Sequence, residues 1–82
     1  MSGWIETEAG LRREVKTASF MESLDLANRL APLAEAMSHH PDLELGWGYL
    51  RIRLVTHDAG KVTEKDRNLA REFDKILGPP GP

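Results

Sequence analysis

All three histidines of the chain lie within one stretch, EAMSHHPDLELGWGYLRIRLVTHD, residues 35–58. His39 and His40 are adjacent and precede a proline, and His57 follows an alternating segment. Imidazole has an unperturbed pKa of about 6.5, so it gives and takes protons near neutral pH. Two or three imidazoles around one pocket could therefore act as acid and base in a single proton-transfer reaction.

Carboxylates stand where they could assist these imidazoles. Glu35 precedes His39 by four residues, so the two side chains share one face if the segment is helical. Asp58 and Asp66 follow His57. Each residue also has a simpler interpretation: a surface histidine, a solvated helix carboxylate, a turn aspartate at position 58 and a helix-capping aspartate at position 66. Spacing alone leaves both interpretations open.

A metal site is the rival chemistry for the same residues. Glu35 and His39 have helical i,i+4 spacing, and His57 could supply another nitrogen ligand. However, adjacent imidazoles such as His39 and His40 point in different directions in regular backbone, and an HExxH motif is absent. The chain has no cysteine, which excludes disulfides and thiolate sites. We therefore expect neither a metal nor another cofactor.

Four segments have the alternation that is typical of β-strands, namely residues 3–8, 11–17, 42–47 and 49–56. Ala9-Gly10 is expected to turn the chain between the first two. In the second segment one face carries Leu11, Arg13 and Val15.

The last two segments indicate a tight antiparallel hairpin. Gly46 and Gly48 flank Trp47 at the junction, where small residues ease a sharp turn. The apolar positions on one face are Leu43, Leu45, Trp47, Leu50, Ile52 and Leu54.

A first helix is expected to begin at Ser19. Ser19 and Glu22 have capping-box spacing, and Pro41 disfavours helical backbone at His40, so the helix should end near Ser38. Pro32 lies inside the pattern and predicts a kink or a break. The predicted buried face comprises Phe20, Leu24, Leu26, Ala27, Leu30, Ala31, Leu33, Ala34 and Met37.

A second helix is expected from about Val62 to Leu77. Thr63 and Asp66 have the spacing of a capping box, with aspartate in place of the usual glutamate. Its apolar face comprises Leu69, Phe73, Ile76 and Leu77.

The order strand, strand, helix, strand, strand, helix predicts an α+β two-layer fold, with two helices on one face of a four-stranded antiparallel sheet. We expect one domain over residues 1–78 and a C-terminal tail over residues 79–82. A chain of 82 residues buries only about 60% of its unfolded surface. A homodimer or homotetramer would add to that buried surface.

Charge and hydropathy exclude several classes of protein. The formal net charge is −2, so no overall positive field draws the chain to nucleic acid or anionic lipid. No apolar run approaches the roughly 20 residues that span a bilayer. The opening MSGWIETEAG lacks the basic and apolar blocks of a signal peptide. We therefore expect a cytoplasmic protein that contacts neither membrane nor nucleic acid directly.

The segment HHPDLELGWGYLRIRLVTHDAGKVTEKD resembles the signature region of the pterin-4a-carbinolamine dehydratases, also known as dimerisation cofactors of a homeodomain transcription factor. The shared pattern is an acidic residue, a His-His-Pro, an aromatic residue, a Thr-His and an aspartate. Here these are Glu35, His39-His40-Pro41, Trp47, Thr56-His57 and Asp66. The resemblance extends over about residues 3–77.

This resemblance implies dehydration of 4a-hydroxytetrahydropterins to quinonoid dihydropterin and water, as part of tetrahydrobiopterin recycling. Loss of the hydroxyl needs an acid at the leaving oxygen and a base at a ring nitrogen proton. By the resemblance, His39 and His57 would be the acid/base pair, and His40 would hold the substrate and support catalysis. The other implied site residues are Pro41, Thr56, Asp58 and Ala59 in the pocket, with Glu35 and Asp66 in support.

The resemblance also implies assembly into dimers or tetramers. Its alternative function is that of a non-enzymatic partner protein, because family relatives act as a transcriptional dimerisation cofactor or a RuBisCO assembly factor. The assembly-factor type typically lacks the full histidine set, so retention of His39, His40 and His57 favours the enzyme. Leu43 stands where many members have tryptophan, and Lys61 replaces the second glycine after Thr-His-Asp.

Overall fold

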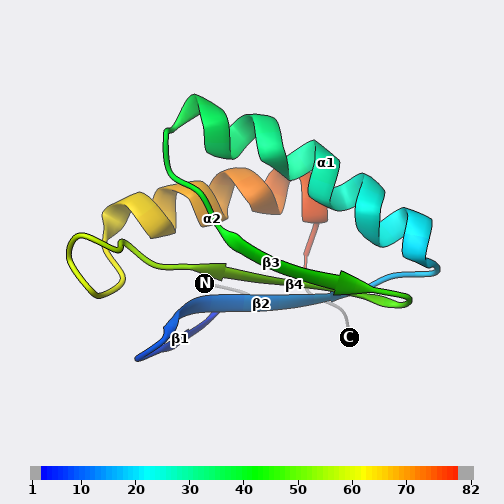
Figure 1. Cartoon of the computed structure of the whole chain (residues 1–82), viewed down its shortest axis with the longest axis horizontal. Helices are drawn as coiled ribbons and strands as arrows, with labels where there is room; N and C mark the ends of the chain where they lie inside the picture. The colour runs from blue at the N-terminus through cyan, green and yellow to red at the C-terminus, as the bar shows by residue number, and fades with distance from the viewer. Residues whose placement is uncertain (1–2, 80–82) are drawn as a thin grey trace.

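The computed structural model describes residues 3–79, which form one sheet and two helices. Figure 1 shows both helices on the same side of the sheet, with the other side uncovered. The predicted two-layer α+β fold is confirmed, and no helix in this range is long and apolar enough to cross a membrane. Of the predicted tail, residues 80–82 lie outside the described residues. The elements are β1 (Ile5–Thr7), β2 (Gly10–Lys16), α1 (Phe20–Ala36), β3 (Asp42–Gly46), β4 (Tyr49–Leu54) and α2 (Glu64–Leu77).

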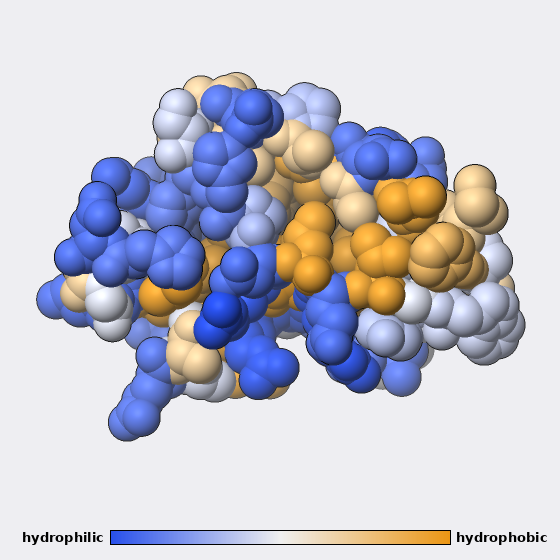
Figure 2. All heavy atoms as spheres, in the orientation of Figure 1, coloured by the Kyte–Doolittle hydropathy of each residue, from blue (hydrophilic) through white to orange (hydrophobic). Residues whose placement is uncertain are grey.

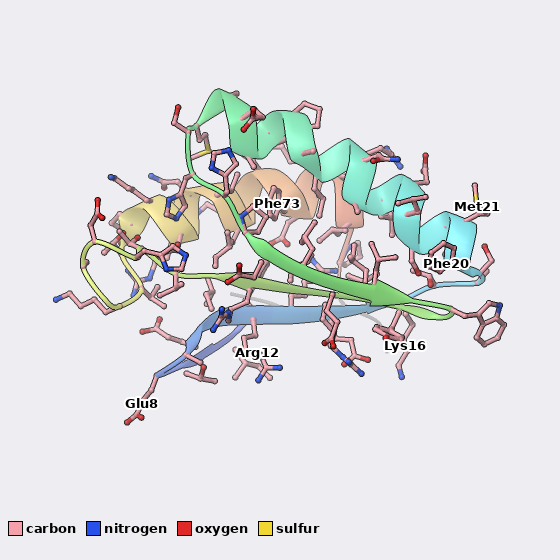
Figure 3. The ribbon with its side chains drawn as sticks, in the orientation of Figure 1. Glu8, Arg12, Lys16, Phe20, Met21 and Phe73 are labelled. Carbon is pink, nitrogen blue, oxygen red and sulfur yellow. The ribbon has the colours of Figure 1, made fainter. Side chains whose placement is uncertain are left out.

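The four strands pair antiparallel in the order β1-β2-β4-β3. Arg13 of β2 lies opposite Ile52 of β4, and both are buried beneath the helices. Figure 3 shows Arg12 and Lys16 pointing away from the helices, whereas Phe73 of α2 lies between the layers. The core comprises Trp4, Leu11, Ala27, Leu30, Ala34, Leu50, Ile52, Leu54, Leu69, Ala70 and Phe73.

Helix α1 begins where the capping residues predict, because the Ser19 hydroxyl accepts a hydrogen bond from the Glu22 N–H at 3.1 Å. It packs over β3 and β4 and against α2. Its buried stripe is narrower than predicted. Phe20, Ala31 and Met37 are exposed, because the sheet and α2 cover only one side of the helix. The buried residues of α1 are Ser23, Ala27, Leu30 and Ala34.

Of the kink or break predicted at Pro32, the break is wrong, since α1 is continuous through that residue. Pro32 and Asn28 are both exposed. The Asn28 carbonyl loses its usual helical donor, but on the exposed side water can bond it instead, which lowers the cost of the proline. The unbroken helix carries its C-terminus to the same end of the molecule as the β4–α2 connection, at the left of Figure 1.

The β3–β4 hairpin lies at the opposite end of the molecule. Trp47, predicted in a strand, occupies the turn instead, and 75% of it is exposed. The Thr17 N–H donates to the Gly48 carbonyl at 3.0 Å, and the Ser23 hydroxyl donates to the Gly46 carbonyl at 2.8 Å. These bonds fasten the start of α1 to the hairpin turn.

Candidate active site

Helix α1 ends in a turn that directs the chain toward α2. The Ser38 N–H donates to the Glu35 carbonyl and the His39 N–H donates to the Ala34 carbonyl, both at 3.1 Å. This pair of bonds is a Schellman motif, which needs a left-handed backbone just beyond the helix. Ser38 supplies it, with φ of 49°. Such a backbone costs a non-glycine residue about 1–2 kcal/mol, so the turn that delivers His39 is held against local preference.

The His39 ring is held by the carboxylate of Asp66, in the first turn of α2. Nε2 of His39 lies 2.5 Å from Oδ1 of Asp66, and the two side chains are 11% and 0% exposed. Oδ2 of Asp66 accepts from the Thr56 hydroxyl at 2.8 Å and from the Thr63 N–H at 2.9 Å. One carboxylate therefore joins the end of α1, the end of β4 and the start of α2.

The charge state of Asp66 decides which way these bonds run. Burial on its own raises the pKa of Asp66, but the hydrogen bonds from His39, Thr63 and Thr56 prevail and hold that pKa below the ordinary aspartate value. Asp66 is then ionised at neutral pH and can only accept hydrogen bonds. Nε2 of His39 must therefore carry a hydrogen, which leaves Nδ1 as the nitrogen available to a ligand.

Thr56 has its hydroxyl committed to this cluster. Its hydroxyl donates to Asp66, and the hydroxyl oxygen also lies 2.6 Å from the Thr63 hydroxyl oxygen. The residue is 8% exposed. Its hydroxyl therefore has no hydrogen left to donate to a bound molecule.

His57 is carried by a tight turn that follows Thr56. The Thr56 carbonyl accepts from the N–H groups of Ala59 and Gly60 at 3.1 and 2.9 Å. The Thr56 N–H donates to the Lys61 carbonyl at 3.1 Å and closes the loop. The main chain is thus well bonded, whereas the His57 side chain is exposed.

His40 is in a third kind of environment. Nε2 of its ring contacts the Glu35 carboxylate, and both side chains are well exposed, at 62% and 73%. The sequence spacing suggested that Glu35 would meet His39. It meets His40 instead, because α1 ends at Ala36 and the Schellman turn swings His39 toward α2.

A hollow of about 360 Å³ opens between the α1–β3 and β4–α2 connections. This end of the molecule is largely hydrophilic in Figure 2, whereas apolar residues gather along α1 and β3 toward the other end. All three imidazoles border the hollow. Ala59, Glu35 and Asp66 do not line it, but Asp66 contacts His39 and Glu35 contacts His40. The lining residues are Ser38, His39, His40, Pro41, Asp42, Thr56, His57, Asp58 and Lys65.

Some of these residues were not predicted from the sequence. Ser38 and Asp42 flank the His-His-Pro segment, so their position in the chain was a usable signal. Lys65 lies in the first turn of α2 beside Asp66, so the capping box could have placed it. Thr63 was predicted only as a helix cap. Its contact with Thr56 has no signal in the sequence.

Two further hollows lie over the uncovered face of the sheet, around Arg12 and Arg51. Arg51 pairs with Glu14 at 3.3 Å and with Glu44 at 3.0 Å. Neither hollow contains a histidine, so proton transfer near neutral pH favours the histidine-lined hollow. Across residues 3–79, no three histidine or acidic side chains converge so as to hold a metal ion.

The structure is thus a small α+β protein with three histidines around one hollow. Residues 1–76 match the family described as pterin 4 alpha carbinolamine dehydratase, and the chain belongs to this family. A relative from Mycolicibacterium vanbaalenii is 42% identical over 78 residues, covering 95% of this chain and 84% of its own. One from Picosynechococcus is 40% identical over 73 residues, covering 89% and 79%. Both carry the provisional name pterin-4-alpha-carbinolamine dehydratase.

Two solved structures share the fold. The transcriptional coactivator/pterin dehydratase from Brucella melitensis has a TM-score of 0.84 and 28% identity, over 93% of this chain and 83% of its own. A pterin dehydratase-like protein described as a RuBisCO assembly factor in the alpha-carboxysome has a TM-score of 0.76 and 23% identity, over 95% and 93%. The second likeness is evidence of fold alone.

Proposed function

We propose that this protein dehydrates 4a-hydroxytetrahydropterins to quinonoid dihydropterin and water, in tetrahydrobiopterin recycling in the cytoplasm. The family and the names of the relatives support a pterin dehydratase. The observation that carries the proposal is the single hollow bordered by all three imidazoles. Its volume of about 360 Å³ falls in the range of small-molecule sites.

The reaction needs one proton delivered and one removed. A base takes the proton from a ring nitrogen of the pterin, the C4a–oxygen bond breaks, and an acid protonates the leaving hydroxyl to give water. His39 and His57 are the proposed pair. Nδ1 of His39 exchanges the proton, and Asp66 stabilises the imidazolium that forms. The exposed His57 carries out the other of the two proton transfers.

The remaining lining residues hold the substrate in this proposal. His40, with its Glu35 partner, contacts the pterin and supports catalysis. Pro41, Thr56, Asp58 and Ala59 shape the binding surface, Ala59 through the turn that carries His57. A homodimer or homotetramer is the proposed assembly, since a domain of this size gains stability from buried surface.

A stopped-flow absorbance assay tests the proposal. A 4a-hydroxytetrahydrobiopterin solution is generated in situ, and its decay is followed with and without the protein. We expect an acceleration that rises linearly with protein concentration. His40→Ala should nearly abolish it while circular dichroism and assembly stay unchanged, because His40 is exposed and its loss leaves the core intact.

The matched control is Trp47→Ala, which removes an exposed side chain at the far end of the molecule. Its turnover should equal that of the wild type. If folded wild-type protein gives no acceleration, the proposed enzyme activity is refuted. If turnover is unchanged in His40→Ala, the proposed site is refuted.

A partner protein without catalysis is the second candidate function. Its support is the Brucella relative, whose description couples coactivator and dehydratase, together with large exposed apolar side chains on this chain. Phe20, Met21 and Trp47 are 47%, 69% and 75% exposed, at the end away from the hollow. Affinity capture from native lysate should then retain a partner that Trp47→Ala loses and His40→Ala keeps. Equal recovery of a partner with the wild type, Trp47→Ala and His40→Ala counts against this candidate. Failure to recover a partner with any of the three also counts against it.

A further inference from the structure

The helix cap of α2 and the histidine hollow are built from the same hydrogen bonds. Thr63 is the N-cap of α2, and its hydroxyl oxygen accepts from the Lys65 N–H at 3.3 Å. The same oxygen lies 2.6 Å from the Thr56 hydroxyl, whose oxygen in turn lies 2.8 Å from Asp66. A chain of contacts thus runs from Thr63 through Thr56 and Asp66 to His39.

The direction of this chain is fixed by counting hydrogens. The ionised Asp66 has none to give, so the Thr56 hydroxyl must donate to it. A hydroxyl carries a single hydrogen, so Thr56 can only accept in its contact with Thr63. The Thr63 hydroxyl therefore donates to Thr56. No buried side-chain polar atom of the described residues is left unsatisfied by this arrangement.

We propose that Thr63 is a positioning residue for the dehydration reaction, acting through Thr56 and Asp66 to keep His39 hydrogen-bonded through Nε2–H with Nδ1 free. The inference rests on the proposed function for its kinetic consequence. Without the Thr63 hydroxyl, the buried Thr56 oxygen loses the hydrogen bond that it accepts, and the bond that Thr56 donates to Asp66 becomes weaker. Asp66 then holds its charge and the His39 tautomer less firmly, because linked hydrogen bonds strengthen one another.

Three substitutions separate this role from plain helix capping. Thr63→Val keeps the volume and removes the hydroxyl. Thr63→Ser keeps the hydroxyl. Ser19→Ala removes the corresponding cap of α1, whose hydroxyl bonds the Glu22 N–H at the other end of the molecule. A fourth substitution, Thr63→Gly, guards against misfolding of Thr63→Val, because glycine is accepted at N-caps and also lacks the hydroxyl.

The readouts are the carbon NMR titration of the Asp66 carboxyl, the nitrogen NMR tautomer signals of His39, and the kcat and KM of dehydration. Thr63→Val and Thr63→Gly should raise the Asp66 titration midpoint and introduce the Nδ1–H tautomer. They should also lower kcat about fivefold at unchanged KM, the size of one neutral hydrogen bond. Thr63→Ser should match the wild type, and Ser19→Ala should change none of these.

An unmoved Asp66 midpoint and His39 tautomer in Thr63→Val, or failure of Thr63→Ser to restore them, would overturn the proposal. An equal change in Ser19→Ala would also overturn it, because it would show a general effect of helix capping. The NMR signals are read without substrate. If the wild type does not accelerate dehydration at all, they still decide the role of Thr63, and only the proposed function fails.

Discussion

Helix α2 carries one aspartate near each end. Both accept several hydrogen bonds, but they differ in burial and in their partners. Asp66 in the first turn is fully buried and accepts from His39, Thr56 and the helix cap. Asp74 near the last turn is 30% exposed on its side chain. It accepts from the Trp4 indole N–H at 2.8 Å and from Arg13 at 2.6 Å.

The difference lies in the partner that each carboxylate holds. Arg13 keeps its charge at every accessible pH, so the pair with Asp74 can fasten β2 to α2 but cannot exchange protons. Imidazole is the side-chain group suited to proton exchange near neutral pH, and His39 borders a hollow. The same residue type on the same helix therefore supports structure at one end and proposed chemistry at the other.

The largest expected effect concerns turnover in Asp66→Asn and Asp74→Asn. An asparagine amide at position 66 can donate to Nε2 of His39, which would move the ring hydrogen to Nδ1 and remove the proposed base. We expect kcat to fall about 100-fold or more in Asp66→Asn and to stay within about twofold of wild type in Asp74→Asn. Single-turnover kinetics on samples shown to be folded would check this. Equal losses of kcat in the two variants would contradict the different roles assigned to Asp66 and Asp74.

The Arg13–Asp74 pair is expected to contribute to the stability of the fold. Asp74→Ala leaves the Arg13 guanidinium, only 4% exposed, with the Gly78 carbonyl as its remaining partner. Breaking a fully buried ion pair costs about 3–5 kcal/mol, and the partial exposure of Asp74 reduces this to about 2 kcal/mol. Urea unfolding should show that loss, while exposed Asp25→Ala should change stability by less than about 0.5 kcal/mol. A loss no greater than that of the control would contradict a stabilising role for the Arg13–Asp74 pair.

A smaller effect is expected for Trp4→Phe, which keeps the ring in the core and removes the indole N–H. The Asp74 carboxylate keeps Arg13 and is partly open to water, so the loss should be about 1 kcal/mol of unfolding free energy. Thermal and urea unfolding would measure it. Turnover should be unchanged. A drop in kcat would mean that the contacts around Asp74 affect those around Asp66.

The smallest expected effect is on the pH dependence of stability. The pKa of Asp66 is held below its ordinary value, so its ionisation contributes stability at pH values above about 4. That contribution is lost as the pH falls through the lowered pKa. Between pH 5 and pH 3 the unfolding free energy should therefore fall less steeply in Asp66→Asn than in the wild type. Parallel curves in urea unfolding would contradict this assignment.

The sequence predicted the fold well because strand alternation and helix caps are local signals. The hairpin turn, the Ser19 cap and the Thr63–Asp66 capping box all depend on residues a few positions apart. The sequence could not exclude a break at Pro32, because the cost of a proline in a helix depends on which side of α1 faces water. Pairings across the layers had no local signal either.

The candidate site shows the same limit. The motif named the three histidines, but their partners come from distant parts of the chain. Glu35 meets His40 and not His39 because Ser38 adopts a left-handed backbone that no helix pattern predicts. From the sequence, Asp66 had two interpretations: a helix-capping residue and a support for the histidines. The structure shows that it accepts from the Thr63 N–H and contacts His39 at the same time.

Titration of the protein with a non-reacting dihydropterin, followed by nitrogen-15 NMR, is the sharpest test of whether a pterin binds in the histidine-lined hollow. The chain supplies its own reporters, since all three histidines border the hollow while the Trp4 indole reports on the Asp74 cluster. We expect saturable shifts of the His39, His40 and His57 ring signals, with the Trp4 signal unmoved. Shifts at Trp4 with the histidines silent, or no saturable shift at any of them, would contradict this expectation.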